Sequence, residues 1–259
     1  MSQRVAIITG AGRGIGAATA VQLAAAGWSL VLVDAPDPDP ALPYELCTAA
    51  ELDAVAASTG ALTHRGDVRD VEALAGAVAL AESRLGGLDA AIACAGVIGG
   101  GVPQWDVPPA TEQALLDINL GGVLNLARVA VPALLRRPSP RSGRFIAVAS
   151  AAASRGMPMI AAYCAAKAGV TGLVRSLAAE LGASGVTANA VSPGSTRTAI
   201  LDESARLYAL DSADDFAAQQ PMERLLEPAE IAAAIAFLAG EGSSAITGAV
   251  LPVDGGLAL

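Results

Sequence analysis

The chain has 259 residues, of which 53% are hydrophobic and only 3% aromatic, so its core must consist largely of aliphatic side chains and alanine. This composition excludes a disordered chain and a collagen-like fibre. Lys and Arg number 16 and Asp and Glu number 25, a net charge of −9, and an acidic surface repels nucleic acid and anionic membranes. We expect a single domain over residues 1–259, a length that one α/β domain commonly has.

The three cysteines, Cys47, Cys94 and Cys164, lie far apart and lack the paired spacings of zinc and redox sites. We therefore expect reduced thiols, no metal site and a cytoplasmic protein. The apolar run near the N-terminus, V-A-I-I-T-G, is too short for a signal peptide. Gly, Arg or Asp interrupts every other candidate for an apolar span of about 18 residues, so we expect no membrane segment.

Short apolar strands alternate with helices along the chain. Predicted strands cover Val5–Thr9, Leu30–Val33, Asp89–Ala93, Phe145–Ala149, Thr187–Val191 and Ala249–Val253. Predicted helices cover Ala17–Ala26, Val71–Ser83, Ala110–Leu135, Ala161–Leu181 and Pro228–Leu238. The strands are continuously apolar, which is typical of parallel strands buried on both faces. The pattern predicts an α/β fold, a single Rossmann-type doubly wound parallel sheet flanked by helices.

A glycine-rich turn joins the first strand to the first helix, where residues 9–16 read T-G-A-G-R-G-I-G. Glycines let the backbone approach a pyrophosphate closely, and the helix N-terminus offers free N–H groups. Such a turn alone is as often a plain turn, but its place between strand and helix favours a nucleotide site. The candidate contacts are Gly10, Arg13, Gly14, Ile15 and Gly16.

Asp34 ends the second strand. There its carboxylate can accept hydrogen bonds from both ribose hydroxyls of an adenosine, and it would repel a 2′-phosphate. This position favours NAD over NADP. The alternative interpretation is an aspartate that merely begins a turn.

Two segments depart from the regular alternation. Four prolines lie between residues 36 and 43, and Thr48 with Glu51 then predicts a capped helix start, so we expect an insert near residues 35–57. The segment over residues 196–221 is longer and more acidic than a connection between a strand and a helix requires. We expect this segment to form a substrate lid.

Tyr163 and Lys167 lie one helical turn apart, on one face of a predicted helix. A tyrosine with its usual pKa of about 10 is a poor base at neutral pH unless a neighbouring cation stabilises the phenolate. Lys167 is the only lysine of the chain, so this spacing rarely arises by chance. A surface pair is the alternative interpretation.

Two further polar residues are candidates for the same site. Ser150 follows the strand Phe145–Ala149, at the sheet edge where open α/β folds bind ligands, and its hydroxyl can polarise a carbonyl. Asn119, within D-I-N-L-G-G, can bind a water or a helix carbonyl. The alternative for Asn119 is a surface or kink position.

Together these residues resemble the short-chain dehydrogenase/reductase family, over Val5 to Gly256. The motifs T-G-x-x-x-G-x-G, Asp67-Val68, Asn119, Ser150, Tyr163, Lys167, Pro193-Gly194 and V-D-G-G follow the order of that family. The resemblance implies that Tyr163 is the general acid/base and that Ser150 orients the reacting oxygen. It further implies that Lys167 binds the nicotinamide ribose and lowers the pKa of Tyr163, and that Asn119 holds a proton-relay water.

The resemblance also implies the remaining contacts to the cofactor. Asp67 and Val68 would contact adenine, and Thr196 and Thr198 would meet the nicotinamide carboxamide. Gly96, Pro193 and Gly194 are further candidate cofactor contacts. One departure is that A-C-A-G at residues 93–96 replaces the family's usual N-N-A-G, so that Cys94 stands where an amide commonly ties neighbouring strands.

By this resemblance the chain is an NAD-dependent oxidoreductase that transfers a hydride between NAD(H) and a secondary alcohol or ketone. Candidate lining residues predict an apolar substrate: Trp105, Met157, Met159, Ile160, Ile200 and Leu201. A non-catalytic dinucleotide-binding sensor or scaffold is the alternative, although binding alone needs no ionisable tyrosine. Related proteins pair their long apolar helices, so we expect a homotetramer.

The insert resembles the extra segment that follows the second strand in the mycofactocin-associated branch of the family. That branch is thought to hold NAD too tightly to exchange and to pass electrons to a peptide-derived redox carrier. The alternative is an ordinary surface loop on a dehydrogenase whose NAD exchanges freely.

Overall fold

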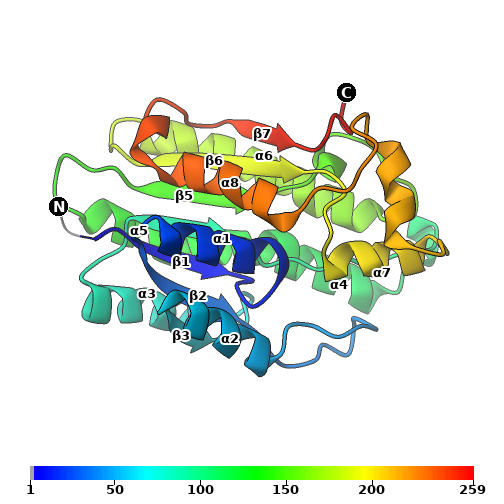
Figure 1. Ribbon diagram of the computed structural model, residues 1–259, viewed down its shortest axis with the longest axis horizontal. Coiled ribbons are helices and arrows are strands. Elements are labelled where there is room, and N and C mark those ends of the chain that lie inside the picture. The colour runs from blue at the N-terminus through cyan, green and yellow to red at the C-terminus, as the bar shows by residue number, and fades with distance from the viewer. Residues whose placement is uncertain (1–2) are drawn as a thin grey trace.

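The apolar strands predicted from the sequence form one parallel sheet in the computed structural model, which describes residues 3–259 (Figure 1). Within these residues seven strands lie in the order β3-β2-β1-β4-β5-β6-β7. The strands are β1 (Val5–Thr9), β2 (Ser29–Asp34), β3 (Leu62–Arg65), β4 (Ala90–Ala93), β5 (Arg144–Val148), β6 (Thr187–Pro193) and β7 (Val250–Val253). Every pairing is parallel, which confirms the predicted fold class.

Helices cover both faces of the sheet (Figure 1). They are α1 (Gly14–Ala25), α2 (Ala49–Thr59), α3 (Val71–Leu85), α4 (Pro109–Leu116), α5 (Gly122–Arg136), α6 (Ala161–Leu181), α7 (Ala199–Leu207) and α8 (Pro228–Ala239). Helices α1, α2 and α8 pack together on one face, and α3, α5 and α6 pack on the other. This double layer is why the central strands are apolar on both sides.

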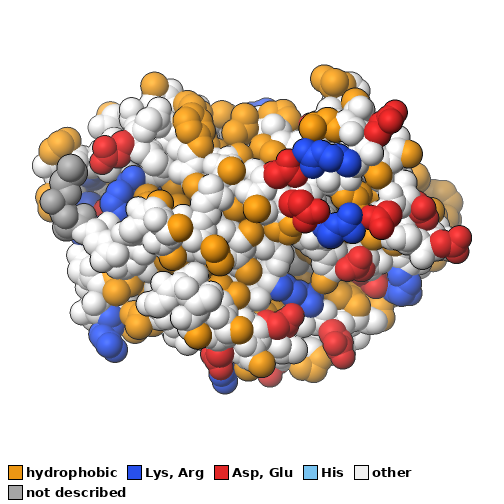
Figure 2. All heavy atoms as spheres, viewed as in Figure 1, with side chains coloured by type: hydrophobic (Ala, Val, Ile, Leu, Met, Phe, Trp, Pro, Cys, Tyr) orange, Lys and Arg blue, Asp and Glu red, His pale blue; other side chains and the backbone are white. Residues whose placement is uncertain are grey.

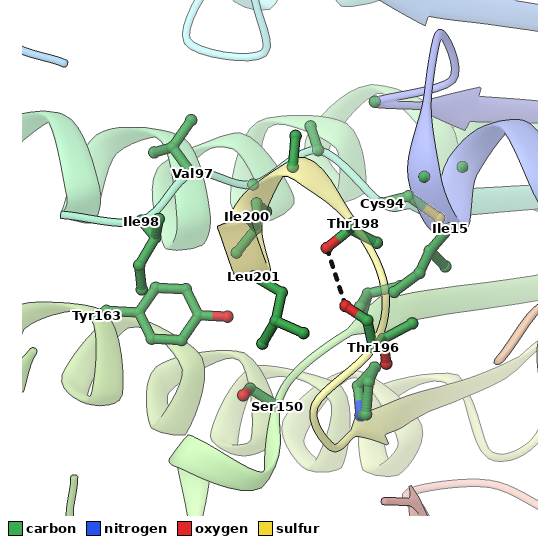
Figure 3. Close-up of a pocket in the computed structure, with 18 of the residues that line it drawn as sticks. Ile15, Cys94, Val97, Ile98, Ser150, Tyr163, Thr196, Thr198, Ile200 and Leu201 are labelled. Atoms are coloured by element: carbon green, nitrogen blue, oxygen red, sulfur yellow. Dashed lines mark hydrogen bonds between the residues drawn. The ribbon is translucent and has the colours of Figure 1, made fainter. Parts of the chain in front are cut away.

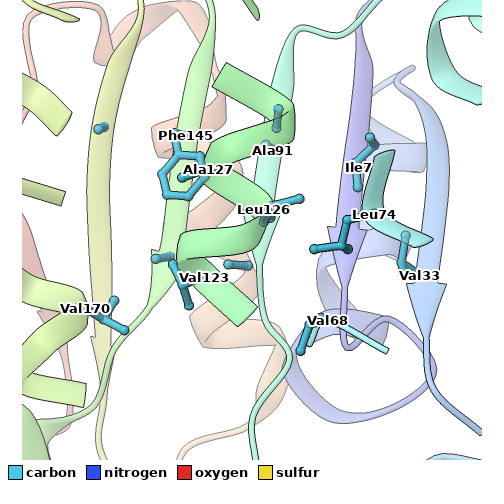
Figure 4. Close-up of a cluster of buried hydrophobic side chains, with 14 of the residues drawn as sticks. Ile7, Val33, Val68, Leu74, Ala91, Val123, Leu126, Ala127, Phe145 and Val170 are labelled. Carbon is cyan, nitrogen blue, oxygen red and sulfur yellow. The ribbon is translucent and has the colours of Figure 1, made fainter. Parts of the chain in front are cut away.

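The core is divided by the sheet into two clusters. Neighbouring residues of a strand point to opposite faces, and accordingly Ile7 belongs to the cluster under α3, α5 and α6, whereas Ile8 belongs to the cluster under α1 and α8. Figure 4 shows Ile7 on the first of these faces with Leu74, Leu126 and Phe145. All four side chains are at most 1% exposed.

The sequence missed strand β3 and misjudged one helix. β3 lies at the edge of the sheet and reads L-T-H-R, so it lacks the continuous apolar run of a central strand. The predicted helix over 110–135 is present, but a π-helical turn at Asp117–Gly121 separates α4 from α5. The Asn119 side chain donates to the Leu115 carbonyl inside this turn, at 2.9 Å.

Among residues 3–259 one helix has the length and composition of a membrane span, a candidate that we did not expect. The continuous helix Pro109–Arg136 is long and apolar enough by length and composition, because its few charges are spread out. Half of its apolar window is buried inside the fold. It packs on β4, β5 and α3, as the core helix of an α/β sheet does.

The segments predicted to be insert and lid have regular structure of their own. Thr48 caps α2: its hydroxyl accepts from the Glu51 N–H at 3.2 Å, and the Glu51 carboxylate accepts from the Thr48 N–H at 2.7 Å. This confirms the predicted capping box. Residues 196–221 contain α7 and the 3-10 helix η4 (Ala213–Gln219), which share a small cluster of Leu201, Ala205, Phe216 and Leu225.

Candidate active site

A cavity of about 490 Å³ opens at the carboxyl ends of the strands. It lies where β1 and β4 are neighbours and the strand order reverses, the position at which open α/β sheets bind ligands. Apart from Asn119, every predicted site residue lines it: Gly10, Arg13, Gly14, Ile15, Gly16, Asp34, Asp67, Val68, Gly96, Ser150, Tyr163, Lys167, Pro193, Gly194, Thr196 and Thr198. The structure thus brings together residues from the whole length of the chain.

The glycine loop forms a cradle that side chains would fill. Gly10 has a φ of +65°, and a Cβ there would lie 2.6 Å from the Ala95 Cα. A Cβ on Gly16 would lie 2.0 Å from the Gly10 carbonyl oxygen. No acidic residue occupies the first turn of α1, so its positive end is not neutralised. The cradle therefore fits a diphosphate group.

Asp34 is held by backbone at the end of β2. Its carboxylate accepts hydrogen bonds from the Gly12 N–H at 2.8 Å and the Ala35 N–H at 2.9 Å. Burial raises the pKa of Asp34, and these hydrogen bonds oppose the rise. The carboxylate lines the cavity beside the glycine loop, so it is placed to accept from ribose hydroxyls.

The sequence missed Cys47, which also lines this end of the cavity. A Cβ on Gly12 would lie only 2.0 Å from the Cys47 Sγ, so the insert packs directly on the glycine loop. Burial and the Asp34 carboxylate raise the pKa of Cys47 to about 12, so the thiol is neutral. The sequence signal for this contact was Gly12, the second glycine of G-A-G. A glycine without a side chain leaves room for another segment of the chain to pack on the loop.

Asp67 and Val68 lie beyond the glycine loop with Arg69. Burial raises the pKa of Asp67, but hydrogen bonds from Arg69 outweigh it and hold that pKa below its usual value. The Arg69 guanidinium also contacts the Asp39 carboxylate of the insert, at 2.7 Å. The Asp39 side chain is only 6% exposed, and its ion pair with Arg69 ties the insert to the part of the cavity wall that Asp67 and Val68 form.

Tyr163, Ser150 and Lys167 meet at the other end of the cavity. Figure 3 shows the hydroxyls of Tyr163 and Ser150 directed into the same space, with Leu201 of α7 nearby. The Lys167 Nζ donates to the Val148 carbonyl at 2.9 Å and lies 5.8 Å from the centre of the Tyr163 ring. The one-turn spacing on α6 therefore brings both side chains to one site.

Burial dominates the ionisation of this pair. It lowers the pKa of Lys167 to about 8 and raises the pKa of Tyr163 to about 12, with the Ser150 hydroxyl opposing the second shift. The direction for Tyr163 is opposite to the lowering that we expected. The physical reason is that the ammonium is directed at the Val148 carbonyl, so it does not offset the burial of the phenol.

Asn119 lies behind the cavity wall and is completely buried. Its amide group donates to the carbonyls of Val97 and Leu115, at 3.0 and 2.9 Å, and accepts from the Val97 N–H at 3.1 Å. Both amide protons are thus used on backbone. Asn119 joins the π-helical turn to the segment that follows β4, which agrees with the kink interpretation.

Pro193 ends β6, and at Gly194 the chain turns tightly toward the segment predicted to be the lid. A Cβ on Gly194 would lie 2.6 Å from the Asp254 carbonyl oxygen. Gln220, which the sequence analysis missed, is 1% exposed and accepts from the Ser195 N–H at 2.8 Å. The Thr198 side chain reaches within 3.3 Å of a Cβ built on Gly14, so the start of the lid lies against the glycine loop.

Cys94 lines the cavity in place of the family's usual amide. Burial raises the pKa of its thiol to about 12. The tie between β1 and β4 is made by Thr9, whose carbonyl accepts from the Cys94 N–H at 3.2 Å and whose hydroxyl accepts from the Ala95 N–H at 3.4 Å. Among residues 3–259 no group of three His, Cys, Asp or Glu is placed to hold a metal.

The expected apolar lining is correct for Met157, Ile160, Ile200 and Leu201 and wrong for Trp105 and Met159. Trp105 is 84% exposed, on a 3-10 turn outside the cavity. Met159 has a φ of +63°, and its carbonyl accepts from the Gly101 N–H at 3.0 Å. This hydrogen bond joins the loop that contains Met159 to the loop that contains Gly101. Val97, Ile98, Tyr208 and Phe216 are among the other lining residues.

Comparison with known proteins gives consistent results along the whole chain. The family model described as "Enoyl-(Acyl carrier protein) reductase" matches residues 10–258. (-)-trans-Carveol dehydrogenase of Rhodococcus erythropolis is 37% identical, over 99% of this chain and 98% of that protein. Cis-4-hydroxycyclohexanecarboxylate dehydrogenase of Sinomonas cyclohexanicum is also 37% identical, over 98% of this chain and 96% of that protein.

A solved structure of a related protein has the same fold over nearly the whole chain. Carveol dehydrogenase from Mycobacterium avium in complex with NAD superimposes with a TM-score of 0.93, at 33% identity, over 99% of this chain and 98% of that one. Sequence and structure thus agree on the fold. The chain belongs to the short-chain dehydrogenase/reductase family of oxidoreductases.

Proposed function

We propose that the chain transfers a hydride between NAD(H) and a secondary alcohol or ketone, with Tyr163 as general acid/base. The observation that carries this proposal is that Tyr163, Ser150 and Lys167 line the same cavity as the glycine loop. NAD, as in the solved carveol dehydrogenase, supplies the hydride acceptor or donor when it is bound. The α1 N-terminus and Asp34 fit its diphosphate and its adenosine ribose.

Each polar residue at the catalytic end has a separate task. In the oxidative direction Tyr163 takes the proton of the substrate hydroxyl, and Ser150 orients that oxygen. Lys167 binds the nicotinamide ribose and places a positive charge beside Tyr163, since a pKa of about 8 keeps it mostly protonated at neutral pH. Asn119 positions the Val97 backbone. A proton-relay water near Asn119, adenine contacts by Asp67 and Val68, and carboxamide contacts by Thr196 and Thr198 stay predictions.

The substrate is an apolar alicyclic alcohol or the matching ketone. Met157, Ile160, Ile200 and Leu201 offer an apolar surface beside the two hydroxyls. The alcohols named in two relatives, trans-carveol and cis-4-hydroxycyclohexanecarboxylate, both carry the hydroxyl on a ring. Residues 196–221 are the lid over this substrate, and the whole of residues 1–259 is one catalytic domain.

The insert over residues 35–57 holds NAD in place, and the enzyme belongs with the mycofactocin-associated branch. Three contacts support this: Asp39 with Arg69, the Arg13 guanidinium on the Glu45 carbonyl at 2.9 Å, and Cys47 against Gly12. NAD should then survive gel filtration, and turnover should require a dye or a peptide-derived carrier. Free multi-turnover exchange with added NAD would make it an ordinary exchanging dehydrogenase in the cytoplasm.

Replacing Tyr163 by Phe tests the catalytic assignment. The rate at which a panel of alcohols reduces the bound NAD, followed as reduced nicotinamide in a single turnover, should fall by about 10²–10⁴-fold while NAD binding is nearly unchanged, because only the proton-transferring hydroxyl is lost. Tyr208→Phe is the matched control: it removes a hydroxyl from the same cavity that donates to the Pro158 carbonyl, and should cost far less. Retention of more than about a tenth of the activity in Tyr163→Phe would contradict the assignment. A non-catalytic sensor would reduce no NAD with any alcohol.

A further inference from the structure

We propose that Tyr44, which the insert carries, is a positioning residue for the substrate: it holds the backbone of Ile98, and thereby the cavity wall beside Tyr163. The proposal rests on the dehydrogenase function proposed above. It goes further because it gives the insert a second role, at the substrate end of the cavity.

The contact that carries the proposal joins two distant parts of the chain. The Tyr44 phenolic oxygen accepts a hydrogen bond from the Ile98 N–H at 2.9 Å. Tyr44 is half-buried and packs against the cluster under α3, α5 and α6, beside Leu42, which is 5% exposed. Packing thus holds the ring in place and aims its hydroxyl at Ile98.

Ile98 depends on such a partner because it lies outside the sheet. β4 ends at Ala93, and Ile98 is only 2% exposed, so its N–H needs a hydrogen-bond acceptor from within the protein. The preceding residue, Val97, is held in the same manner by the Asn119 amide. Two side chains, Asn119 and Tyr44, therefore determine the path of this segment.

The segment forms the cavity wall nearest to the catalytic tyrosine. Val97 and Ile98 both line the cavity, and Figure 3 shows the Ile98 side chain beside the Tyr163 ring, with Ile200 and Leu201 of α7 nearby. A substrate between these walls takes its position relative to the Tyr163 hydroxyl from Ile98. Displacing the Ile98 backbone therefore weakens substrate binding before it affects the proton transfer itself.

The same insert also contacts the cofactor cradle. The carbonyl of Glu45, next to Tyr44, accepts from the Arg13 guanidinium of the glycine loop, and Cys47 packs on Gly12. An insert that lifts to release NAD would carry Tyr44 away from Ile98. The substrate site is thus complete only while the insert is closed, so by linkage a bound substrate tightens the binding of NAD. If NAD leaves only through the opened insert, a substrate that favours the closed insert also slows the loss of NAD.

The first experiment compares Tyr44→Phe with wild type as NAD-loaded proteins, with cyclohexanol as the probe and an artificial redox dye to reoxidise the bound cofactor. The KM for cyclohexanol should rise about tenfold, the order expected when a buried N–H loses its partner, while kcat stays within about twofold. Amide hydrogen exchange at Ile98 should become at least about tenfold faster. An unchanged KM together with unchanged exchange at Ile98 would overturn the proposal.

Two further variants separate this role from general loosening of the insert. Thr111→Val removes a hydroxyl that donates to the Ala41 carbonyl of the insert at 3.3 Å, and should leave the KM unchanged. Ile98→Val combined with Tyr44→Phe should raise the KM by less than the product of the two single fold-changes, since both act on one wall. Fold-changes that simply multiply would mean that Tyr44 does not act through Ile98.

A third measurement needs no variant, so it holds even if Tyr44→Phe fails to fold. Saturating cyclohexanone, which cannot reduce bound NAD, should slow NAD release from wild type several-fold; equal rates would overturn the coupling. Failure of the proposed function has a different signature. Full activity in Tyr163→Phe would disprove the catalytic role of Tyr163, while the exchange rate at Ile98 would still report on Tyr44.

Discussion

At the scale of single residues, Lys167 is a buried charge that lowers the stability of the fold. The side chain is 3% exposed, and among the described residues its Nζ bonds to the Val148 carbonyl. Burial lowers the pKa of Lys167 from 10.5 to about 8, so the fold disfavours the charged form that the proposed contact with the nicotinamide ribose uses. A buried cation of this kind is expected at functional sites rather than in a core optimised for stability.

We therefore expect Lys167→Met to stabilise the protein measured without cofactor. Below pH 8 the lysine is charged in both the folded and the unfolded state, so the cost of burying the charge is present in full. Between pH 8 and 10.5 the unfolded chain binds a proton that the folded protein lacks, so wild-type stability rises with pH. At pH 7 the free energy of unfolding in urea should increase by about 2 kcal/mol in the variant, allowing for one lost hydrogen bond.

The advantage of Lys167→Met should shrink as the pH rises from 8 to 10.5. Arg128→Met, which removes an exposed cation from α5, is the control and should change stability little at any of these pH values. A Lys167→Met protein that is less stable than wild type at pH 7 would mean that burial of this charge costs the fold nothing.

Asp34 carries the predicted preference for NAD over NADP. Two backbone N–H groups orient its carboxylate toward the cavity, so a 2′-phosphate would meet a negative charge. Asp34→Ala should weaken NAD binding by about 10–100-fold, and adding Ala35→Arg should favour NADP. Fluorescence titration of cofactor-free protein measures both affinities. Equal affinity of wild type for the two cofactors would show that Asp34 does not face the ribose.

At the scale of the element, the insert is attached to its surroundings by side chains on several elements. The Asp39 carboxylate contacts Arg69, which lies after β3, and the Thr111 hydroxyl of α4 donates to the Ala41 carbonyl. Tyr44 reaches the segment after β4. Opening the insert would break these contacts together, and the resulting barrier is the physical basis of the proposed slow NAD release.

Asp39→Asn tests this barrier. The amide keeps the size of the side chain but loses the charge that attracts Arg69, so NAD release should accelerate about tenfold, measured as the NAD retained after successive gel filtrations. Arg69 keeps Asp67 as a partner, so the fold should survive. Asp53→Asn is the control, because the Asp53–Arg65 pair is more than half exposed on both sides and contributes little. Equal NAD retention in all three proteins would contradict the role of the ion pair.

At the scale of the whole molecule, charge and apolar surface are unevenly distributed. Figure 2 shows acidic and basic side chains gathered at the end that carries α7, while the face over α1 and α8 bears few charges. Only half of the apolar window along Pro109–Arg136 is buried inside the chain, and Leu124 on α5 is 42% exposed. This helix is therefore the surface on which we base the proposed homotetramer.

Light scattering at micromolar concentration should give the mass of a tetramer. Leu124→Glu should shift it toward dimers or monomers, since it places a charge on the apolar helix surface. Val21→Glu on α1 is the matched control, because Val21 is 53% exposed but lies on the opposite side of the sheet. A wild-type monomer would refute the assembly, and equal dissociation by both variants would place the interface elsewhere.

Much of the fold could be predicted because its signals are local. Continuous apolar runs identified the central strands, and the glycine turn between β1 and α1 identified one end of the cavity. The edge strand β3 escaped because a partly solvated strand of four residues has no such run. The π-helical turn escaped because hydrophobic periodicity does not report a side chain that bonds within the helix.

The sequence by itself determined the class of fold, the family and most of the residues that line the cavity. Tyr163 and Lys167 are one turn apart, and Asp34 and Ser150 lie at the ends of strands that meet at one sheet edge. Only the tertiary structure decided that Tyr44 holds Ile98, that Cys47 lies on Gly12 and that Trp105 lies outside the cavity. The two contacts join residues tens of positions apart, and the exposure of Trp105 depends on how its loop packs. Spacing and periodicity describe neighbours along the chain, whereas these features arise from the packing of elements in space.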